Sequence, residues 1–109
     1  MPIYQPSGYD EIIRVSKENP GKLIVIDCKA AWCGPCKAIH PLLVSLSDTL
    51  SHKVIFMEID VDDEEHADTV QRFEVSAMPT FIYMKNGLIK AKTMGASIKQ
   101  VQDTINLFA

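Results

Sequence analysis

Two cysteines, Cys33 and Cys36, are separated by two residues in the motif WCGPC, which spans residues 32–36. Two thiols at this spacing, at the junction of a strand and a helix, can pass between a dithiol and a disulfide. A disulfide that closes so short a loop restrains the unfolded chain little, so a purely structural crosslink would be a weak use of the pair. Redox chemistry is therefore the leading hypothesis for this chain.

The motif lies between a predicted strand and a predicted helix. Residues 23–28 form an apolar run that is typical of a short buried strand. After this run, apolar residues recur at intervals of three and four, which is the pattern of an amphipathic helix. They are Cys36, Ile39, Leu43, Leu46 and Leu50. Cys33 is thus expected in the first turn of this helix.

The position of the two thiols predicts different roles for them. Free N–H groups and the positive end of the helix dipole favour a thiolate at Cys33, and the Cys36 thiol can donate a hydrogen bond to it. Cys33 is therefore the predicted nucleophile. Cys36 lies one turn further along, on the apolar face, so it is expected to be less exposed, to keep its proton and to act as the resolving thiol. Gly34 and Pro35 suit a tight helix entry, because glycine permits close backbone approach and proline presets a helical φ.

The sequence resembles the thioredoxin family. Residues 32–36 match the family's active-site motif at every position, and further matches follow in order along nearly the whole chain. They are Asp27, Met78-Pro79-Thr80, Asn86-Gly87 and Gly95-Ala96. The resemblance implies an α/β structure with the thioredoxin fold, in which helices flank both faces of a central mixed sheet. It also implies one domain over residues 1–109.

Local patterns predict the remaining elements. The expected elements are a short strand near residues 3–4, a helix opened by a capping box at Ser7 and Asp10, a strand at residues 54–59, a helix at residues 64–73, two strands at residues 80–84 and 88–93 joined across Asn86-Gly87, and a closing helix through residues 98–108. Alternating strands and helices followed by a hairpin favour a mixed sheet with helices on both faces.

Asp27 interrupts the apolar strand before the motif, and burying a carboxylate without a partner costs free energy. A structural aspartate with satisfied hydrogen bonds is one explanation. The resemblance implies another, in which Asp27 is a buried acid behind the disulfide that accepts the Cys36 proton through water, with a pKa raised by desolvation. Lys29 stands where many bacterial relatives carry tryptophan, and Glu58 stands where they carry lysine. The pKa of Asp27 is therefore not inferred from those relatives. Glu58 resembles the residue found in animal-type sequences.

Trp32, Met78, Pro79 and Gly95 are expected to bind substrate, because the resemblance places them around the cysteines. A proline that begins a strand needs no special role, since it does not have to donate to the sheet. The resemblance implies a cis Met78–Pro79 peptide that faces the cysteines, and a Met78 backbone that pairs with an extended substrate segment. Simple packing is the alternative for Trp32.

Several other positions at which reactive groups occur or could occur are expected to have no catalytic role. Cys28 lies inside the apolar strand and is expected to pack as a small core residue. His40 follows Cys36 by four positions, but no fourth ligand has suitable spacing, so no metal site is expected. His52 and His66 are expected to face solvent. Ala77 stands where some animal members of the family carry an extra cysteine, so no regulatory disulfide is expected there.

The composition limits the partners and the compartment. A net charge of -3, with scattered basic residues, argues against nucleic acid or an anionic membrane as the main partner. Residues 1–21 contain no long apolar run, so neither a secretory signal nor a membrane span is expected. Three cysteines with one motif pair fit a reducing compartment, and a cytoplasmic location is expected.

The predicted function is a protein disulfide reductase that cycles between the dithiol and the Cys33–Cys36 disulfide and keeps cytosolic proteins reduced. The resemblance implies that thioredoxin reductase regenerates the dithiol with electrons from NADPH, so that the chain binds no cofactor. It further implies peroxiredoxins, ribonucleotide reductase and methionine sulfoxide reductases as targets. The protein is expected to be a monomer, although a weak dimer through the Trp32 surface stays open.

Three alternatives remain. An oxidase or isomerase of the same fold would donate its disulfide, but such relatives usually carry histidine between the cysteines, whereas Gly34-Pro35 is expected to tune the pair towards reduction. A binding module would present the surface around Trp32, Met78 and Gly95 to a fixed partner, with secondary redox chemistry. A structural zinc knuckle would contain stoichiometric metal and would unfold with a chelator.

Overall fold

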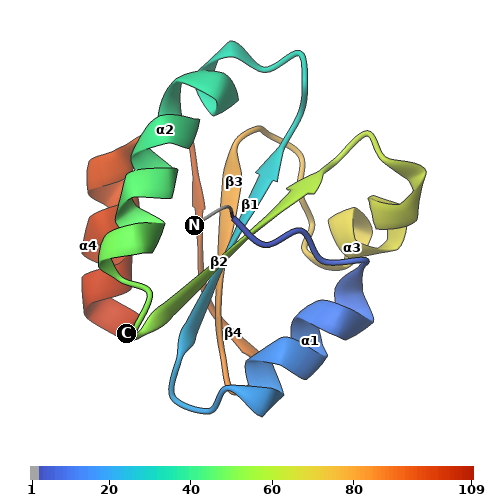
Figure 1. Cartoon of the computed structure of the whole chain (residues 1–109). Helices are drawn as coiled ribbons and strands as arrows, with labels where there is room; N and C mark the ends of the chain where they lie inside the picture. The colour runs from blue at the N-terminus through green and yellow to red at the C-terminus, as the bar shows by residue number, and fades with distance from the viewer. Residues whose placement is uncertain (1–2) are drawn as a thin grey trace.

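A four-stranded mixed sheet forms the centre of the protein (Figure 1). The structure is a computed structural model that describes residues 3–109. Its elements, in chain order, are α1 (Tyr9–Glu18), β1 (Leu23–Lys29), α2 (Gly34–Thr49), β2 (Val54–Asp60), the 3-10 helix η1 (Glu64–His66), α3 (Ala67–Arg72), β3 (Thr80–Lys85), β4 (Leu88–Met94) and α4 (Ile98–Phe108). The strand order is β2-β1-β3-β4, in which β1 and β2 are parallel and the other neighbours are antiparallel. This arrangement confirms the predicted fold class.

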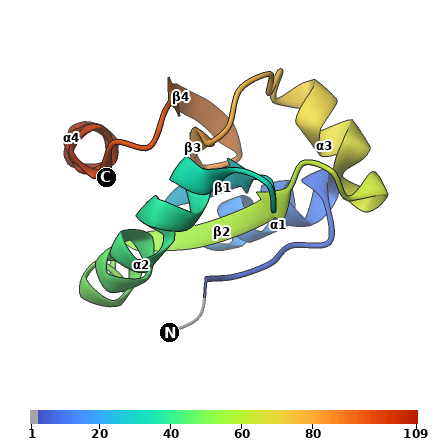
Figure 2. The same ribbon diagram turned by 90° about the horizontal axis from the view of Figure 1, so that it is seen from above.

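Two pairs of helices cover opposite faces of the sheet, as the view from above shows (Figure 2). On one face, Ile39 and Leu43 of α2 pack with Val101 and Ile105 of α4 against the sheet. On the other face, Ile12 of α1 packs against the sheet together with side chains that follow α3. The alternating side chains of the strands supply both cores, because successive residues point to opposite faces.

Strand β1 lies between β2 and β3 and leads directly into the WCGPC motif. Leu23 and Val25 face the core under α2 and α4, whereas Ile24 and Cys28 face the core on the other side. By this alternation Asp27 points to the face that α2 covers. The central strand thus delivers Asp27 to the space behind the start of α2.

The hairpin between β3 and β4 has the expected turn. Asn86 and Gly87 both have positive φ, at 54° and 78°. Two such residues define a type I′ turn, whose twist matches that of the flanking strands.

Three local expectations differ from the structure. The capping box at Ser7 and Asp10 is wrong: Gly8 is the N-cap of α1, and the Ser7 N–H donates instead to the Glu11 carboxylate at 2.7 Å. The helix expected at residues 64–73 is divided into η1 and α3, because His66 leaves the helical region with φ -102° and ψ 5°. The strand near residues 3–4 is reduced to one parallel bridge between Tyr4 and Met57 at the edge of β2.

His66 does not face solvent, which corrects the prediction for this residue. Its exposed fraction is 7%, and it lines a pocket of about 250 Å³ together with Gln5 and Glu58. His66 is the residue at which η1 ends and α3 begins. His52 is exposed, as predicted.

None of the helices found between residues 3 and 109 has the length and apolar character that crossing a bilayer would need.

Candidate active site

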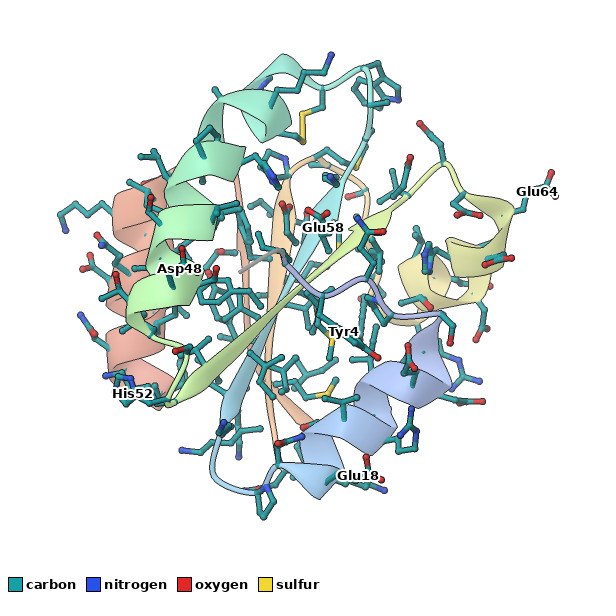
Figure 3. All side chains as sticks on the ribbon, viewed as in Figure 1. Tyr4, Glu18, Asp48, His52, Glu58 and Glu64 are labelled. Carbon is teal, nitrogen blue, oxygen red and sulfur yellow. A yellow bond between two sulfur atoms is a disulfide. The ribbon has the colours of Figure 1, made fainter. Side chains whose placement is uncertain are left out.

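Cys33 and Cys36 form a disulfide at the start of α2, where Figure 3 shows the bonded sulfur atoms. Cys33 is the N-cap residue, one position before the first helical residue, and Pro35 lies in the first turn. The Cys36 backbone N–H donates a hydrogen bond to Cys33 Sγ at 3.2 Å. The sulfur of Cys33 therefore occupies the place where a helix start stabilises negative charge.

The two cysteines are about equally buried in the disulfide form. Their exposed fractions are 4% for Cys33 and 2% for Cys36, so the expected difference in exposure is nearly absent. Gly34 and Pro35, between them, are exposed. Both cysteines pack with Ala30 in a small buried cluster, against which Met78 lies.

Asp27 is a buried acid without a hydrogen-bonding partner among the described residues. Its exposed fraction is 2%, and neither carboxylate oxygen accepts a hydrogen bond from residues 3–109. Burial raises the pKa of Asp27 from 3.8 to about 7, while the positive charge of Lys29 lowers it and the negative charge of Glu58 raises it. A carboxyl group with a pKa near 7 can take up and release a proton at neutral pH.

Glu58 lies beside Asp27 in the parallel pair of strands β1 and β2 (Figure 3). Its Oε2 atom is 3.2 Å from Lys29 Nζ and 3.6 Å from His40 Nδ1, and its Oε1 atom accepts a hydrogen bond from Gln5 Nε2 at 2.9 Å. Sequence reasoning noted Lys29 and Glu58 only as departures from relatives, and it missed the contacts with Gln5 and His40. The one signal in the sequence was the four-residue spacing of Cys36 and His40, which places them on the same side of a helix.

Trp32 stands on the surface next to the disulfide. Its exposed fraction is 67%, and its indole Nε1–H donates to Asp62 Oδ2 at 2.8 Å. Burial in the core therefore does not explain this residue. Asp62 was not predicted as part of the site, since it is thirty positions away along the chain.

Met78, Pro79 and Gly95 come together on the other side of the cysteines. The Met78–Pro79 peptide bond is cis, as the family resemblance implied. Met78 packs against the cluster that contains both cysteines, and the Gly95 N–H donates to the Pro79 carbonyl at 2.9 Å. Gly95 has φ 101°, a conformation that side chains other than glycine rarely adopt. The neighbouring Met94, 58% exposed, adds an apolar group that sequence reasoning missed.

A pocket of about 290 Å³ lies beside Cys36. It is lined by Lys29, Ala30, Ala31, Cys36, Lys37, His40 and Asp60. The pocket therefore leaves room for solvent next to both Cys36 and His40.

Two other candidate chemistries have little support at these positions. Within residues 3–109, no three side chains of the metal-binding types are grouped so that they could hold an ion. Cys28 is a free thiol buried in the core, and burial raises its pKa to about 12. Cys28 thus stays protonated at neutral pH and does not compete with Cys33 as a nucleophile.

Comparisons with known proteins agree with this geometry. A family model described as thioredoxin matches residues 3–106. Human thioredoxin is 46% identical over 85 residues, which cover 78% of this chain and 78% of that protein. The X-ray structure of Fasciola hepatica thioredoxin has a TM-score of 0.91 at 31% identity and covers 98% of this chain and 100% of that one.

A further similar chain comes from a yeast structure on the thiol resolving mechanism in mitochondrial 1-Cys peroxiredoxin via glutathione/thioredoxin systems. Its TM-score is 0.85 at 35% identity, and the match covers 95% of this chain and 93% of that one.

Proposed function

Because the chain belongs to the thioredoxin family and is a protein-disulfide oxidoreductase, we propose that it reduces disulfides of other proteins through Cys33 and Cys36. The observation that carries the proposal is the Cys33–Cys36 disulfide at the N-terminus of α2. A dithiol at this place has a stabilised thiolate and a second thiol within bonding distance.

The reaction transfers two electrons in two exchanges. The Cys33 thiolate attacks one sulfur of a substrate disulfide, so that a mixed disulfide forms and the other substrate sulfur leaves as a thiolate. Cys36 then gives its proton to Asp27 and attacks Cys33 Sγ. The bond between Cys33 and the substrate breaks, the second substrate sulfur leaves as a thiolate, and the Cys33–Cys36 disulfide remains. Water supplies the protons that the two substrate thiolates take up.

The local structure supports these roles. The Cys36 N–H at 3.2 Å and the dipole of α2 both favour negative charge on Cys33 Sγ. Asp27 lies on the face of the sheet under α2, and its pKa of about 7 suits a group that accepts a proton at neutral pH. Gly34 and Pro35 present little side-chain bulk between the two sulfur atoms, and their exposure leaves room for a partner's backbone.

Substrate would bind across the surface formed by Trp32, Met78, Pro79 and Gly95. Met78 packs against the two cysteines, and the hydrogen bond from the Gly95 N–H to the Pro79 carbonyl holds residue 95 next to this segment. An extended substrate segment would pair with the Met78 backbone as an added strand. Its apolar side chains would contact Trp32 and Met94, which are both exposed.

Thioredoxin-family proteins need no bound cofactor for this chemistry. Regeneration would therefore fall to a separate enzyme, and thioredoxin reductase with NADPH is the proposed electron source. Proposed targets are peroxiredoxins, ribonucleotide reductase and methionine sulfoxide reductases in the cytoplasm. The yeast relative from the peroxiredoxin study supports the first of these classes.

Substrate trapping tests the proposal. A Cys36→Ser variant should hold target proteins as mixed disulfides at Cys33, and added dithiothreitol should release them. The matched Cys33→Ser variant, which keeps one thiol of the pair, should trap few or none. Equal trapping by the two variants, or the absence of any trapped protein with Cys36→Ser, would contradict the proposal.

A further inference from the structure

Two carboxylates lie side by side on the face of the sheet that α2 covers. Asp27 of β1 and Glu58 of β2 are register partners in the parallel strand pair, so their side chains point to the same face of the sheet. Their exposed fractions are only 2% and 7%. Two neighbouring carboxylates at low solvent exposure cannot both carry a charge without cost, so the charge on one controls the proton on the other.

Glu58 in turn contacts two basic side chains of different kinds. Lys29 Nζ, 3.2 Å from Glu58 Oε2, comes from β1, and His40 Nδ1, 3.6 Å from the same oxygen, comes from α2. A lysine ammonium stays charged across neutral pH, whereas an imidazole can gain or lose its charge there.

The hydrogen bonds of this pair are incomplete. Glu58 Oε2 and His40 Nδ1 are both buried atoms that make no hydrogen bond with the described residues, although they face each other. Glu58 Oε1, in contrast, is satisfied by Gln5. A protonated imidazole would donate to Oε2 after a shift of a few tenths of an ångström, so the contact is suited to respond to the charge of His40.

The same histidine borders the pocket beside Cys36. This pocket, of about 290 Å³, is lined by Cys36, Lys29 and His40, so it has room for water next to both the Cys36 side chain and the imidazole. His40 therefore lies next to the place where Cys36 must lose its proton in the proposed reaction.

We propose that Glu58 and His40 are positioning residues for the resolving step, and that the charge of the His40–Glu58 pair decides how readily Asp27 accepts the Cys36 proton. When His40 is charged, it neutralises Glu58, and Asp27 releases its proton more easily. When His40 is neutral, the Glu58 charge holds the proton on Asp27. Burial and the Glu58 charge raise the pKa of Asp27, and the Lys29 charge lowers it, as this arrangement requires.

The inference rests on the proposed function, because the step that it regulates is the attack of Cys36 on the mixed disulfide. In that step the proton of Cys36 passes to Asp27 and later to water. The electron pair of the bond between Cys33 and the substrate leaves with the substrate sulfur. Glu58 and His40 form and break no covalent bond to sulfur.

Several other groups face these side chains and belong to the same electrostatic balance. They are Lys37 on α2, Asp60 at the end of β2, and Asp63 and His66 in the segment that follows β2. The test therefore changes Glu58, Lys29 and His40 one at a time and leaves these groups in place.

The first measurement is the titration of the Asp27 carboxyl carbon by NMR in the oxidised protein. Glu58→Gln should lower the Asp27 midpoint by at least about half a pH unit, a threefold change in proton affinity, because it removes the like charge and frees Lys29. Lys29→Met and His40→Gln should both raise the midpoint, because each removes a positive charge. His52→Gln, at the far end of α2 from the disulfide (Figure 3), should leave it unchanged.

This pattern of opposite signs separates the proposal from a structural role, since a loss of packing would not move the midpoint in opposite directions. Glutamine keeps the shape of Glu58 and can still accept from Gln5, and Lys29, with a side chain 32% exposed, tolerates methionine without a new cavity. Midpoints that stay at the wild-type value in Glu58→Gln and in His40→Gln, or that move in the same direction in both, would overturn the inference.

The second measurement is the release of thiols from a chromogenic aromatic disulfide in a single turnover. The first thiol reports the attack by Cys33, and the second reports resolution by Cys36. His40→Gln should shift the pH midpoint of the second phase upward, as in the NMR titration, and should leave the first phase unchanged. If the wild-type protein releases no second thiol, the proposed function fails; if it releases both and His40→Gln leaves the second phase unchanged, only the present inference fails.

Discussion

At the scale of single residues, the site depends on a carboxyl group kept in an environment that disfavours its charge. Asp27 is 2% exposed and is influenced by the positive charge of Lys29 and the negative charge of Glu58. Its pKa is raised from 3.8 to about 7, mainly by burial. A group of this kind can transfer protons at neutral pH. It also lowers the stability of the folded protein as the pH rises, because the folded protein binds the proton more tightly than the unfolded chain and must give it up.

The stability of the oxidised protein should therefore fall as pH rises from about 4 to about 7, the interval between the unfolded and folded pKa values of Asp27. A pKa shift of this size corresponds to a loss of about 4 kcal/mol in the free energy of unfolding. Asp27→Asn should remove that pH dependence, so the variant should be more stable than the wild type by up to about 4 kcal/mol at pH 8 and by less than about 1 kcal/mol at pH 4. Urea unfolding at the two pH values measures the difference.

The matched control is Asp103→Asn on the exposed side of α4, whose effect should stay within about 0.5 kcal/mol at both pH values. If the free energy of unfolding of Asp27→Asn changes with pH as much as that of the wild type, Asp27 is not the group responsible.

The contact of Trp32 with Asp62 gives a second prediction at this scale. Asp62→Ala removes the acceptor of the indole N–H, so the Trp32 side chain should become more mobile. Trp32 is the only tryptophan of the chain, so the fluorescence anisotropy reports its motion and should fall in the variant. The rate at which the variant reduces substrate should also decrease. Glu64→Ala, which removes a nearby exposed carboxylate, should change neither quantity. Unchanged anisotropy in Asp62→Ala would contradict the assigned role of the hydrogen bond.

Sequence reasoning reached the residues of the site unevenly. Cys33, Cys36 and the buried Asp27 could be predicted, because their signals are local: a motif, a helix start and a polar residue in an apolar run. The contacts of Glu58 with His40 and of Trp32 with Asp62 could not, since they depend on strand register and on how α2 docks on the sheet. The burial of His66 was missed for the same reason.

At the scale of elements, N-cap residues determine where helices begin, and one of them also carries the reactive sulfur. Cys33 caps α2 with its sulfur, and Ser97 caps α4 with its hydroxyl, which accepts from the Gln100 N–H at 3.1 Å. Periodicity predicted that these helices exist. It could not predict the division between η1 and α3 or the cap of α1, because competing side-chain hydrogen bonds decide such ends.

Ser97→Ala should destabilise the protein by about 1 kcal/mol, because the Gln100 N–H loses its acceptor at the start of α4. Ser45→Ala, the same exchange on the exposed surface of α2, should change the free energy of unfolding by less than about 0.5 kcal/mol. Chemical denaturation measures both. Equal effects of the two exchanges would argue against a capping role for Ser97.

At the scale of the whole molecule, one sheet separates two cores that share its strands. Ile105 of α4 lies in one core and Ile12 of α1 in the other, and both are fully buried. Because β1 contributes side chains to both cores, neither face can lose its packing without disturbing the other. The chain is therefore expected to unfold as the single domain that its sequence predicts.

Ile105→Ala and Ile12→Ala should each destabilise the protein by about 2–5 kcal/mol, the cost of a cavity at a fully buried isoleucine. In both variants, Trp32 fluorescence and far-ultraviolet circular dichroism should report the same transition. Leu107→Ala, at a residue 75% exposed, is the control and should have little effect. Transitions that separate between the two probes would contradict the single cooperative unit.

The direction of electron transfer is the central claim, and the equilibrium reduction potential of Cys33 and Cys36 against a defined dithiol buffer tests it most directly. The general reference potentials are about -270 mV for thioredoxin and about -180 mV for protein disulfide isomerase. The reductase account predicts a potential near the first value. A potential near the second would mean that the surroundings of Cys33 stabilise the dithiol, and the protein would then act as an oxidant or isomerase.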